Sequence, residues 1–225
     1  MAALTGRRTA AWLTAATALI CYAAMWLGYR QGWGWLGGAD SSALTAAYDV
    51  GIKHPGWVRF WDELCTVFAP VTFRVLGWLA IAVALARRRL RVALFLAISV
   101  ETTEYVTRIA KGLADRPRPG TALVAASSSS FPSGHALGVL VGVAALLTVT
   151  VPLLGARIRP AAIAAGVLIV LLVGVGRVIL NVHHPSDVLA GWSLGYLDVA
   201  LCAWLVRPLS GGRPTGDPPR LDGDE

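Results

Sequence analysis

Long apolar runs separated by short polar stretches dominate the hydrophobic pattern of this chain. The runs are close to twenty residues long, the length of α-helix needed to cross about 30 Å of hydrocarbon. They predict an all-α, polytopic membrane protein in which six transmembrane helices form a bundle. The six predicted spans cover residues 9–29, 66–86, 91–110, 135–154, 161–182 and 188–206.

Composition strengthens the membrane interpretation. Hydrophobic residues make up 56% of the 225 residues and charged residues only 15%, whereas a soluble domain usually carries about a quarter charged residues. A soluble helical protein with very apolar core helices is the weaker alternative. Arg7 and Arg8 precede the first run, as in a signal peptide. That run is longer than a typical signal-peptide core and no convincing small-residue cleavage site follows it, so we expect a retained span.

The distribution of basic residues predicts the orientation. A net charge of +7 would suit a nucleic-acid partner, but the arginines lie between apolar runs and not along one polar helix face, which indicates membrane topology. With the N-terminus in the cytoplasm, the inner segments hold eleven of the 20 Lys and Arg residues and the outer loops hold six. The turn over residues 87–91, with four arginines, is the clearest cytoplasmic signal. We therefore predict that both termini are cytoplasmic and that no nucleic acid is bound.

The chain shows no internal repeat and no separate soluble domain, so we predict a single membrane domain over residues 1–209. Residues 210–225 are rich in Gly, Pro and Asp and are predicted to form a disordered cytoplasmic tail. Three cysteines show neither paired nor CxxC spacing, and they favour neither a disulfide framework nor a metal site. They are Cys21, Cys65 and Cys202.

Residues 30–65 form the longest connection before the tail. Asp40, Ser41 and Ser42 are candidates for capping a short helix, and Pro55 for starting another. The sequence from Gly56 to Trp61 is typical of an interfacial helix in the headgroup layer. An ordered loop with aromatic belt residues fits equally well.

Three polar patches interrupt the apolar pattern, over residues 111–119, 131–135 and 176–187. In the six-span prediction all three reach the outer side of the membrane. Because the choice of spans did not require this, the convergence indicates a common site.

These patches contain the parts of a phosphate site. Lys111, Arg118 and Arg177 are cations that can hold phosphate oxygens, and the two arginines can do so in bidentate fashion. The second patch opens the fourth span from outside, so its helix N-terminus presents free N–H groups and the positive end of the helix dipole. Gly134 would let an anion approach the backbone closely.

Two histidines and a carboxylate accompany the cations. His183 and Asp187 are four residues apart, so the carboxylate can hold one imidazole nitrogen and leave the other basic. His135 is available as a general acid. A zinc site formed by these three residues with His184 is an alternative, which the three clustered cations oppose.

Each part also has a structural explanation. Basic residues at span ends commonly snorkel or anchor the helix, and a lone histidine at a membrane interface is more often structural than catalytic. Pro185 can start a helix whose first turn favours Asp187. The combination of all these residues on one face favours a site.

The patches resemble the three-part signature of the type 2 phosphatidic acid phosphatase superfamily, the lipid phosphate phosphatases. That signature reads Lys, six residues, Arg-Pro; then Pro-Ser-Gly-His; then Ser-Arg, five residues, His, three residues, Asp. Gly176 stands where the family usually has serine, so one phosphate hydrogen bond is absent or is made by a backbone N–H. His183 matches the signature and His184 does not. The other matching residues are Lys111, Arg118, Pro119, Pro132, Ser133, Gly134, His135, Arg177 and Asp187.

The resemblance implies catalysis without a cofactor or a metal. His183 would attack phosphorus to form a phosphohistidine, Asp187 would orient it, and His135 would protonate the leaving oxygen before water releases phosphate. Stabilisation of the transferring phosphoryl group would come from Lys111, Arg118, Ser133, Gly134 and Arg177.

The resemblance also implies the partners and the location. The expected partners are the lipid bilayer and a membrane lipid phosphate, such as a polyprenyl diphosphate, phosphatidic acid or phosphatidylglycerol phosphate. The expected location is a bacterial cytoplasmic membrane, with the site facing the periplasm or exterior. The sequence does not indicate which lipid is cleaved, nor the oligomeric state.

Other functions remain open at this point. A phosphotransferase would pass the same phosphohistidine to a lipid or sugar hydroxyl. A lipid or anion transporter also carries charges within the membrane, although no discontinuous repeat supports it here. Haloperoxidases share the motifs but are soluble, which the six spans oppose.

Arg74, Glu101 and Asp198 lie at comparable depth within their predicted spans. Isolated charges at such depth are costly, so we expect the three to form a buried cluster. The alternative is that each snorkels or faces a water-filled cleft separately.

Overall fold

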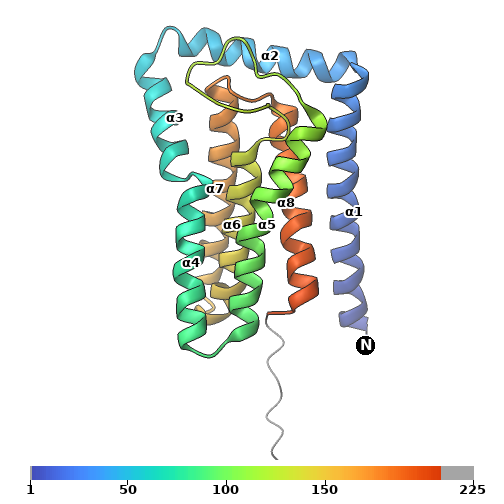
Figure 1. Ribbon diagram of the computed structural model, residues 1–225, viewed down its shortest axis with the longest axis vertical. Coiled ribbons are helices and arrows are strands. Elements are labelled where there is room, and N and C mark those ends of the chain that lie inside the picture. Colours follow the sequence, from blue (N-terminus) through green and yellow to red (C-terminus); the bar gives the residue numbers. More distant parts are fainter. Residues whose placement is uncertain (1, 209–225) are drawn as a thin grey trace, which may run out of the picture.

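The computed structural model describes residues 2–208. Over these residues all the regular secondary structure is helical, as the sequence predicts, and no strand is present. The elements, labelled in Figure 1, are α1 (Ala2–Gln31), α2 (Gly34–Gly51), α3 (Pro55–Val67), α4 (Pro70–Ala86), α5 (Leu90–Ala114), α6 (Gly134–Thr150), the 3-10 turn η1 (Val151–Leu153), α7 (Arg159–Ile179) and α8 (Pro185–Val206).

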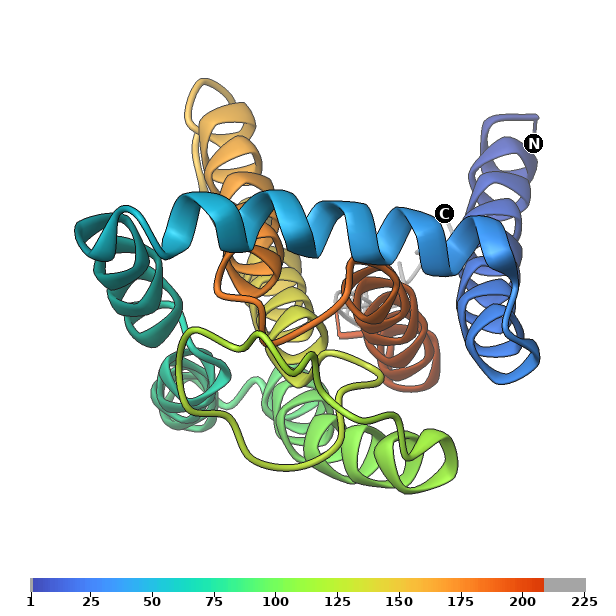
Figure 2. The same cartoon turned by 90° about the horizontal axis from the view of Figure 1, so that it is seen from above.

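The central helix of the bundle is α6, which packs against α4, α5, α7 and α8. At one side, α1 packs against α8, while α2 crosses the top end of the bundle at a steep angle (Figures 1 and 2). The helices α6 and α8 lie very close together where α8 carries two glycines. A Cβ on Gly191 would lie 2.6 Å from the Ser133 carbonyl oxygen, and a Cβ on Gly195 would lie 2.9 Å from that of Leu137. These two glycines therefore hold the start of α8 against the start of α6.

Five helical segments of the described chain are long and apolar enough to cross a membrane: 9–31, 55–86, 134–153, 159–179 and 185–206. The predicted span 91–110 falls within α5, which is not among them. Its apolar sequence is interrupted by four charged residues, Arg91, Glu101, Glu104 and Arg108. Nevertheless, α5 is 25 residues long and lies alongside α4 in the bundle (Figure 1).

The connection between the first two predicted spans is more helical than the sequence suggested. Asp40, Ser41 and Ser42 lie inside a continuous α2, so the prediction that they cap a helix was wrong. The Asp40 carboxylate is instead buried against α8, where other polar groups satisfy it. Pro55 begins α3, as predicted, and the stretch from Gly56 to Trp61 is helical, which contradicts the alternative of an ordered loop.

The predicted charge cluster forms only in part. Arg74 lies 3.4 Å from Glu101 and 2.9 Å from Glu104, and these side chains are about half exposed. Asp198 does not join them. It is buried against another face of α5, where it accepts hydrogen bonds of 3.3 and 3.5 Å from the Thr102 and Thr103 hydroxyls.

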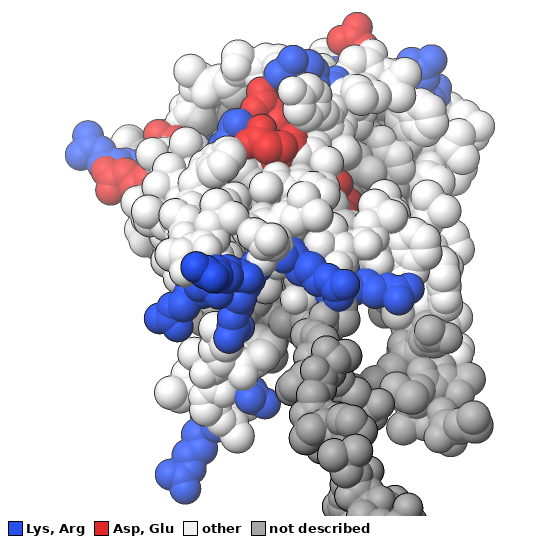
Figure 3. Space-filling model, turned by 60° about the horizontal axis from the view of Figure 1, so that its bottom comes forward, with Lys and Arg blue, Asp and Glu red and all other residues white. Residues whose placement is uncertain are grey.

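The two ends of the bundle differ in charge. Basic side chains gather at the bottom end (Figure 3), where the chain turns from α4 to α5 and from η1 to α7. The first helix begins and α8 ends at this same end (Figure 1). The predicted tail, 210–225, lies outside the described residues, and the domain boundary at residue 209 remains a prediction.

Candidate active site

The three polar patches meet at the top end of the bundle, beneath α2 and beside the loop 115–133 (Figure 2). Their residues come from five parts of the chain. Lys111 lies in the last turn of α5, Arg118 in the loop, Ser133, Gly134 and His135 at the start of α6, Arg177 in the last turn of α7, and His183 and Asp187 at the turn into α8.

The turn between α7 and α8 places His183. Asn181 adopts a left-handed backbone conformation (φ 54°), and its side-chain oxygen accepts a 2.8 Å hydrogen bond from Thr121. The N–H groups of Val182 and His183 then donate to the Arg177 carbonyl oxygen, at 3.2 and 3.3 Å. These bonds end α7 and hold the His183 side chain inside the site.

His183 is buried, with 1% of its surface exposed. Its Nε2 lies 3.2 Å from Nη1 of Arg118. Because a guanidinium group can only donate hydrogen bonds, Nε2 must be the acceptor and the proton of the neutral ring lies on Nδ1. Nδ1 faces Oδ2 of Asp187 at 3.5 Å, which is longer than an ordinary hydrogen bond. Catalytic hydrogen bonds are often long before substrate binds.

The surroundings of His183 keep its ring neutral. Burial lowers its pKa to about 4, and the charges of Arg118 and Arg177 act in the same direction. The nearby carboxylate of Asp187 opposes this shift. At neutral pH Nε2 therefore carries an unprotonated lone pair, which accepts the hydrogen bond from Arg118 in this structure.

His184 has a different position. Its N–H donates to Oδ2 of Asp187 at 2.8 Å, and its Nδ1 lies 3.1 Å from the same oxygen. This reciprocal arrangement caps the first turn of α8. The ring of His184 is thus nearer to Asp187 than that of His183, but it is His183 that contacts Arg118.

Asp187 is fully buried and is surrounded by donors. Its Oδ1 accepts a 2.7 Å hydrogen bond from Arg116, and its Oδ2 accepts one from the Ser130 hydroxyl. Arg116 also donates to Asp40 at 2.8 Å. A buried chain of charges therefore runs from α2 through the loop to the carboxylate beside His183.

Asp40 and Arg116 are the main residues that the sequence analysis missed. Asp40 binds both the hydroxyl and the N–H of Ser186, at 2.6 and 3.0 Å, and so ties α2 to the first turn of α8. A possible signal for Arg116 was its place in the first patch, two residues before Arg118. No local pattern marks Asp40, because its partners are more than seventy residues away.

The three predicted cations lie at this end of the bundle, and none of them forms an ion pair with a carboxylate of residues 2–208. Arg118 donates to the carbonyl oxygens of Ser127, Ser128 and Val182 at 2.8, 3.0 and 2.7 Å, and Lys111 donates to that of Ser129. Arg177 is buried, and its Nε has no hydrogen-bond partner in the described part of the chain. The ion pairs with Asp or Glu in the described part of the chain are made by other basic residues. The positive charge of Lys111, Arg118 and Arg177 is therefore available to an anion.

The start of α6 supplies further donors. Ser133 is the N-cap residue, and its Oγ accepts from the N–H of Ala136 at 3.4 Å. The first N–H groups of the helix, at Gly134 and His135, have no acceptor within the helix. His135 is half-buried. Burial lowers its pKa to about 3, and the charges of Arg177 and its other basic neighbours act in the same direction. A bound anion that offsets these charges would raise this pKa and favour the protonated ring.

Gly176 faces away from this cluster, toward α3. A Cβ there would lie 2.7 Å from the Cys65 sulfur and 3.0 Å from the Trp61 ring. A serine at this position would require the Cys65 or Trp61 side chain to move. The departure from the expected motif therefore accompanies close packing between α7 and α3.

The side chains proposed for a zinc site do not assemble into one. Among the described residues, no group of three or more His, Cys, Asp or Glu side chains is placed to hold a metal ion. Instead, His183 Nε2 faces the guanidinium group of Arg118.

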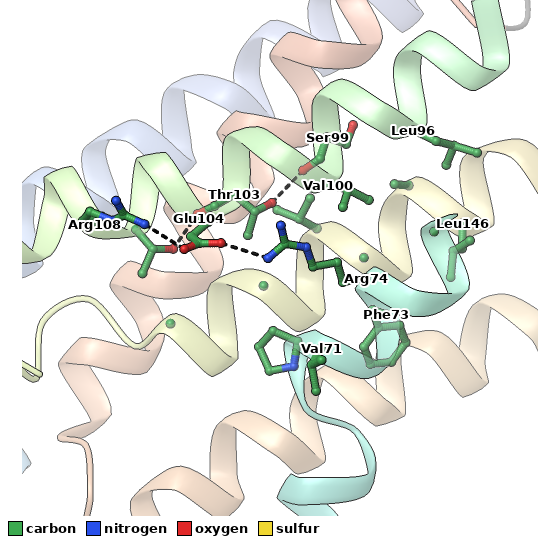
Figure 4. Close-up of a pocket in the computed structure, with 18 of the residues that line it drawn as sticks. Val71, Phe73, Arg74, Leu96, Ser99, Val100, Thr103, Glu104, Arg108 and Leu146 are labelled. Carbon is green, nitrogen blue, oxygen red and sulfur yellow. Dashed lines mark hydrogen bonds and ion pairs between the residues drawn. The ribbon is translucent and has the colours of Figure 1, made fainter. Parts of the chain in front are cut away.

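A groove of about 390 Å³ reaches the end of α5 and the start of α6, and we call it the α4–α6 groove (Figure 4). One end is formed by Lys111, Ser128 and Gly134. From there it extends between α4, α5 and α6 along largely apolar side chains, among them Phe73, Leu96, Val100, Val141 and Leu146. Polar groups of the first two patches and a largely apolar surface therefore line the same groove.

Comparisons with known proteins agree with this geometry. The family model of the PAP2 superfamily matches residues 90–210. Phosphatidylglycerophosphatase B of Bacillus subtilis (strain 168) is 42% identical over 100 residues, which cover 43% of this chain and 49% of that protein. The match thus spans about half the length of this relative. Decaprenylphosphoryl-5-phosphoribose phosphatase of Mycobacterium tuberculosis is 31% identical over 147 residues, or 61% of this chain and 74% of that protein.

A solved structure has the same fold. It is a transmembrane PAP2 type phosphatidylglycerolphosphate phosphatase from Bacillus subtilis, with a TM-score of 0.71 and 26% sequence identity. The similarity covers 91% of this chain and 98% of that one. It therefore extends beyond the part matched by the family model, which begins at residue 90 and leaves out α1 to α4.

Proposed function

Because the chain belongs to the PAP2 superfamily, we propose that it is a lipid phosphate phosphatase that works without a metal and through a phosphohistidine at His183. The observation that carries this proposal is the contact between His183 Nε2 and Arg118, 3.2 Å, in a cluster of cations without carboxylate partners. A neutral imidazole nitrogen is a nucleophile, and unpaired cations attract the phosphate that it would attack.

The proposed reaction has two steps. In the first, the Nε2 lone pair forms a bond to phosphorus while the bond to the leaving oxygen breaks, and His135 gives that oxygen a proton. In the second, His135 takes a proton from water as the water oxygen attacks phosphorus, and the P–N bond breaks to return its electrons to His183. Asp187 stabilises the positive ring by holding Nδ1–H. The charge on the phosphoryl oxygens is balanced by Lys111, Arg118, Arg177, the Ser133 hydroxyl and the free N–H groups at the start of α6, that of Gly134 among them.

The names of the relatives narrow the proposed substrate. Phosphatidylglycerophosphate and decaprenylphosphoryl-5-phosphoribose each carry a terminal phosphomonoester, and each has a second phosphate, a phosphodiester, that joins the headgroup to the lipid. We propose this class of lipid as the substrate. The α4–α6 groove supports it, because an apolar chain could lie there while the terminal phosphate reaches His183.

The test is phosphate release by the purified protein from a panel of lipid phosphates and diphosphates in the presence of excess chelator. We expect release to continue, because the site provides three cations and no cluster of carboxylates of the kind that magnesium uses. Strong inhibition by chelator that one divalent ion reverses would contradict the metal-free mechanism. Release that stops when a lipid or sugar acceptor is supplied would indicate phosphotransfer.

We also propose that α5 is the sixth span and that the site faces the outside of a bacterial cytoplasmic membrane. The basic turns at the opposite end of the bundle support this orientation. Cysteines introduced at Ala125, in the loop, and at Arg87, in the α4–α5 turn, are both at exposed positions. In a background without native cysteines, we expect an impermeant thiol reagent to label Ala125→Cys in intact cells and Arg87→Cys only after lysis. The reverse pattern would overturn the orientation.

A further inference from the structure

Charged side chains line part of the α4–α6 groove, although most of the groove is apolar (Figure 4). Arg74 extends from α4 to Glu104 of α5, at 2.9 Å, and Glu104 also binds Arg108, at 2.8 Å. Glu101 is a second partner of Arg74, at 3.4 Å. Within a membrane, ionisable groups are costly and commonly mark a functional path.

These groups form a row that leads away from the phosphate site. On α5, Arg108 precedes Lys111 by three residues and Glu104 precedes it by seven, so they share one face of the helix. At a rise of 1.5 Å per residue, Arg108 lies about 4.5 Å and Glu104 about 10 Å below Lys111 along the helix axis. The two arginines are therefore between the proposed terminal phosphate and the apolar part of the groove.

The ion pairs leave the arginines able to bind more. A guanidinium group has five N–H donors, and the contacts to Glu101 and Glu104 use only some of those on Arg74 and Arg108. The side chains of Arg74 and Arg108 are 42% and 70% exposed. The unused N–H donors of both arginines are therefore accessible to a ligand in the groove.

We propose that Arg74 and Arg108 form a second anion site, which binds the internal phosphodiester of a lipid whose terminal phosphomonoester is cleaved at His183. Glu101 and Glu104 hold the two guanidinium groups in place and keep them charged among apolar side chains. This inference rests on the proposed function and assigns specificity within it. The enzyme would select lipids with two phosphates separated by a short polyol over lipids with a single phosphate.

The test compares two substrates with identical acyl chains, phosphatidylglycerophosphate and phosphatidic acid, in the same detergent micelles. Only the first has an internal phosphodiester in addition to its terminal phosphate. We expect Arg74→Gln and Arg108→Gln each to lower kcat/KM for phosphatidylglycerophosphate about 10- to 100-fold, the loss typical of one charge-assisted hydrogen bond. The value for phosphatidic acid should change less than about twofold, because that substrate does not reach the second site.

Two further variants sharpen the comparison. Glu104→Gln keeps a hydrogen-bond acceptor for both arginines but removes a negative charge that would repel the phosphodiester. It should therefore lower the KM for phosphatidylglycerophosphate and leave phosphatidic acid unaffected. Arg59→Gln removes an exposed arginine of α3 that does not line the groove, and it should change neither substrate.

Each other outcome has a definite meaning. Equal losses on both substrates would show that the arginines act on the fold, and no loss on either would show that they do not bind the substrate. Both results would overturn the second anion site while leaving the phosphatase proposal intact. Absence of phosphate release from both substrates by the unaltered protein would instead overturn the proposed function, and the second site with it.

Discussion

Replacing His183 by alanine is expected to abolish phosphate release from every lipid substrate, with a loss in kcat of roughly 10⁴-fold or more, as for other covalent nucleophiles. The reason is that no other group among the described residues combines a neutral imidazole with direct contact to a cation of the site. Single-turnover phosphate release, measured with both a monoester and a diphosphate, would show whether the loss is independent of the leaving group.

His184→Ala is the matched control for this experiment. The two histidines are adjacent, both lie near Asp187, and the ring of His184 is the closer, at 3.1 Å against 3.5 Å. Because His184 caps α8, its loss should lower stability and reduce activity by much less than the loss of His183. A covalent phosphoenzyme should be trapped in His184→Ala and not in His183→Ala. The opposite result would mean that the motif spacing identified the wrong histidine.

The architecture of the bundle was largely predictable because hydrophobic length is a strong signal. Five of the six predicted spans correspond to helical segments apolar enough to cross a membrane. The sixth, α5, is interrupted by the charged residues that line the groove, Glu104 and Arg108 among them. The weakest hydrophobic signal therefore occurs in the helix that carries the most charged groups near the site.

The contacts between side chains of neighbouring helices were not predictable from the local sequence pattern. Asp40 resembled a helix cap by its residue type and neighbours, but it lies inside α2, and its carboxylate is bound by Arg116 and Ser186. Asp198 lies at the depth expected of a partner for Arg74, yet it faces Thr102 and Thr103. Depth in a span follows from position in the sequence, whereas the face of a helix that meets a neighbour depends on packing.

The convergence of the three polar patches was predictable, since alternating spans return to the same side of a membrane. What the sequence could not provide was the state of each group. The tautomer of His183 follows from its contact with Arg118, and the neutral ring follows from burial. Both depend on the turn after α7, where Asn181 and Thr121 meet across sixty residues.

The second large effect is expected at His135, and its size should depend on the leaving group. A phosphomonoester such as phosphatidic acid or phosphatidylglycerophosphate expels an alcohol, whose developing negative charge must be neutralised by a proton. A polyprenyl diphosphate expels a monophosphate, whose second pKa is about 6, so it can leave as an anion near neutral pH. His135→Ala should therefore lower kcat for the monoesters about 10²- to 10⁴-fold, the usual contribution of a general acid, and should lower kcat for the diphosphate by less.

The informative quantity is the ratio of kcat to that of the unaltered protein for each substrate under single-turnover conditions, which isolates the chemical step. His135 lies at the start of α6, among the cations that are proposed to hold the phosphate, so its loss could also weaken binding. Weaker binding would raise KM for both substrates alike, whereas loss of a proton donor changes kcat according to the leaving group. Equal losses on both substrates would mean that His135 mainly binds phosphate. A full kcat on the monoesters would exclude it from proton transfer and leave the leaving oxygen to be protonated by another group at this end of the bundle.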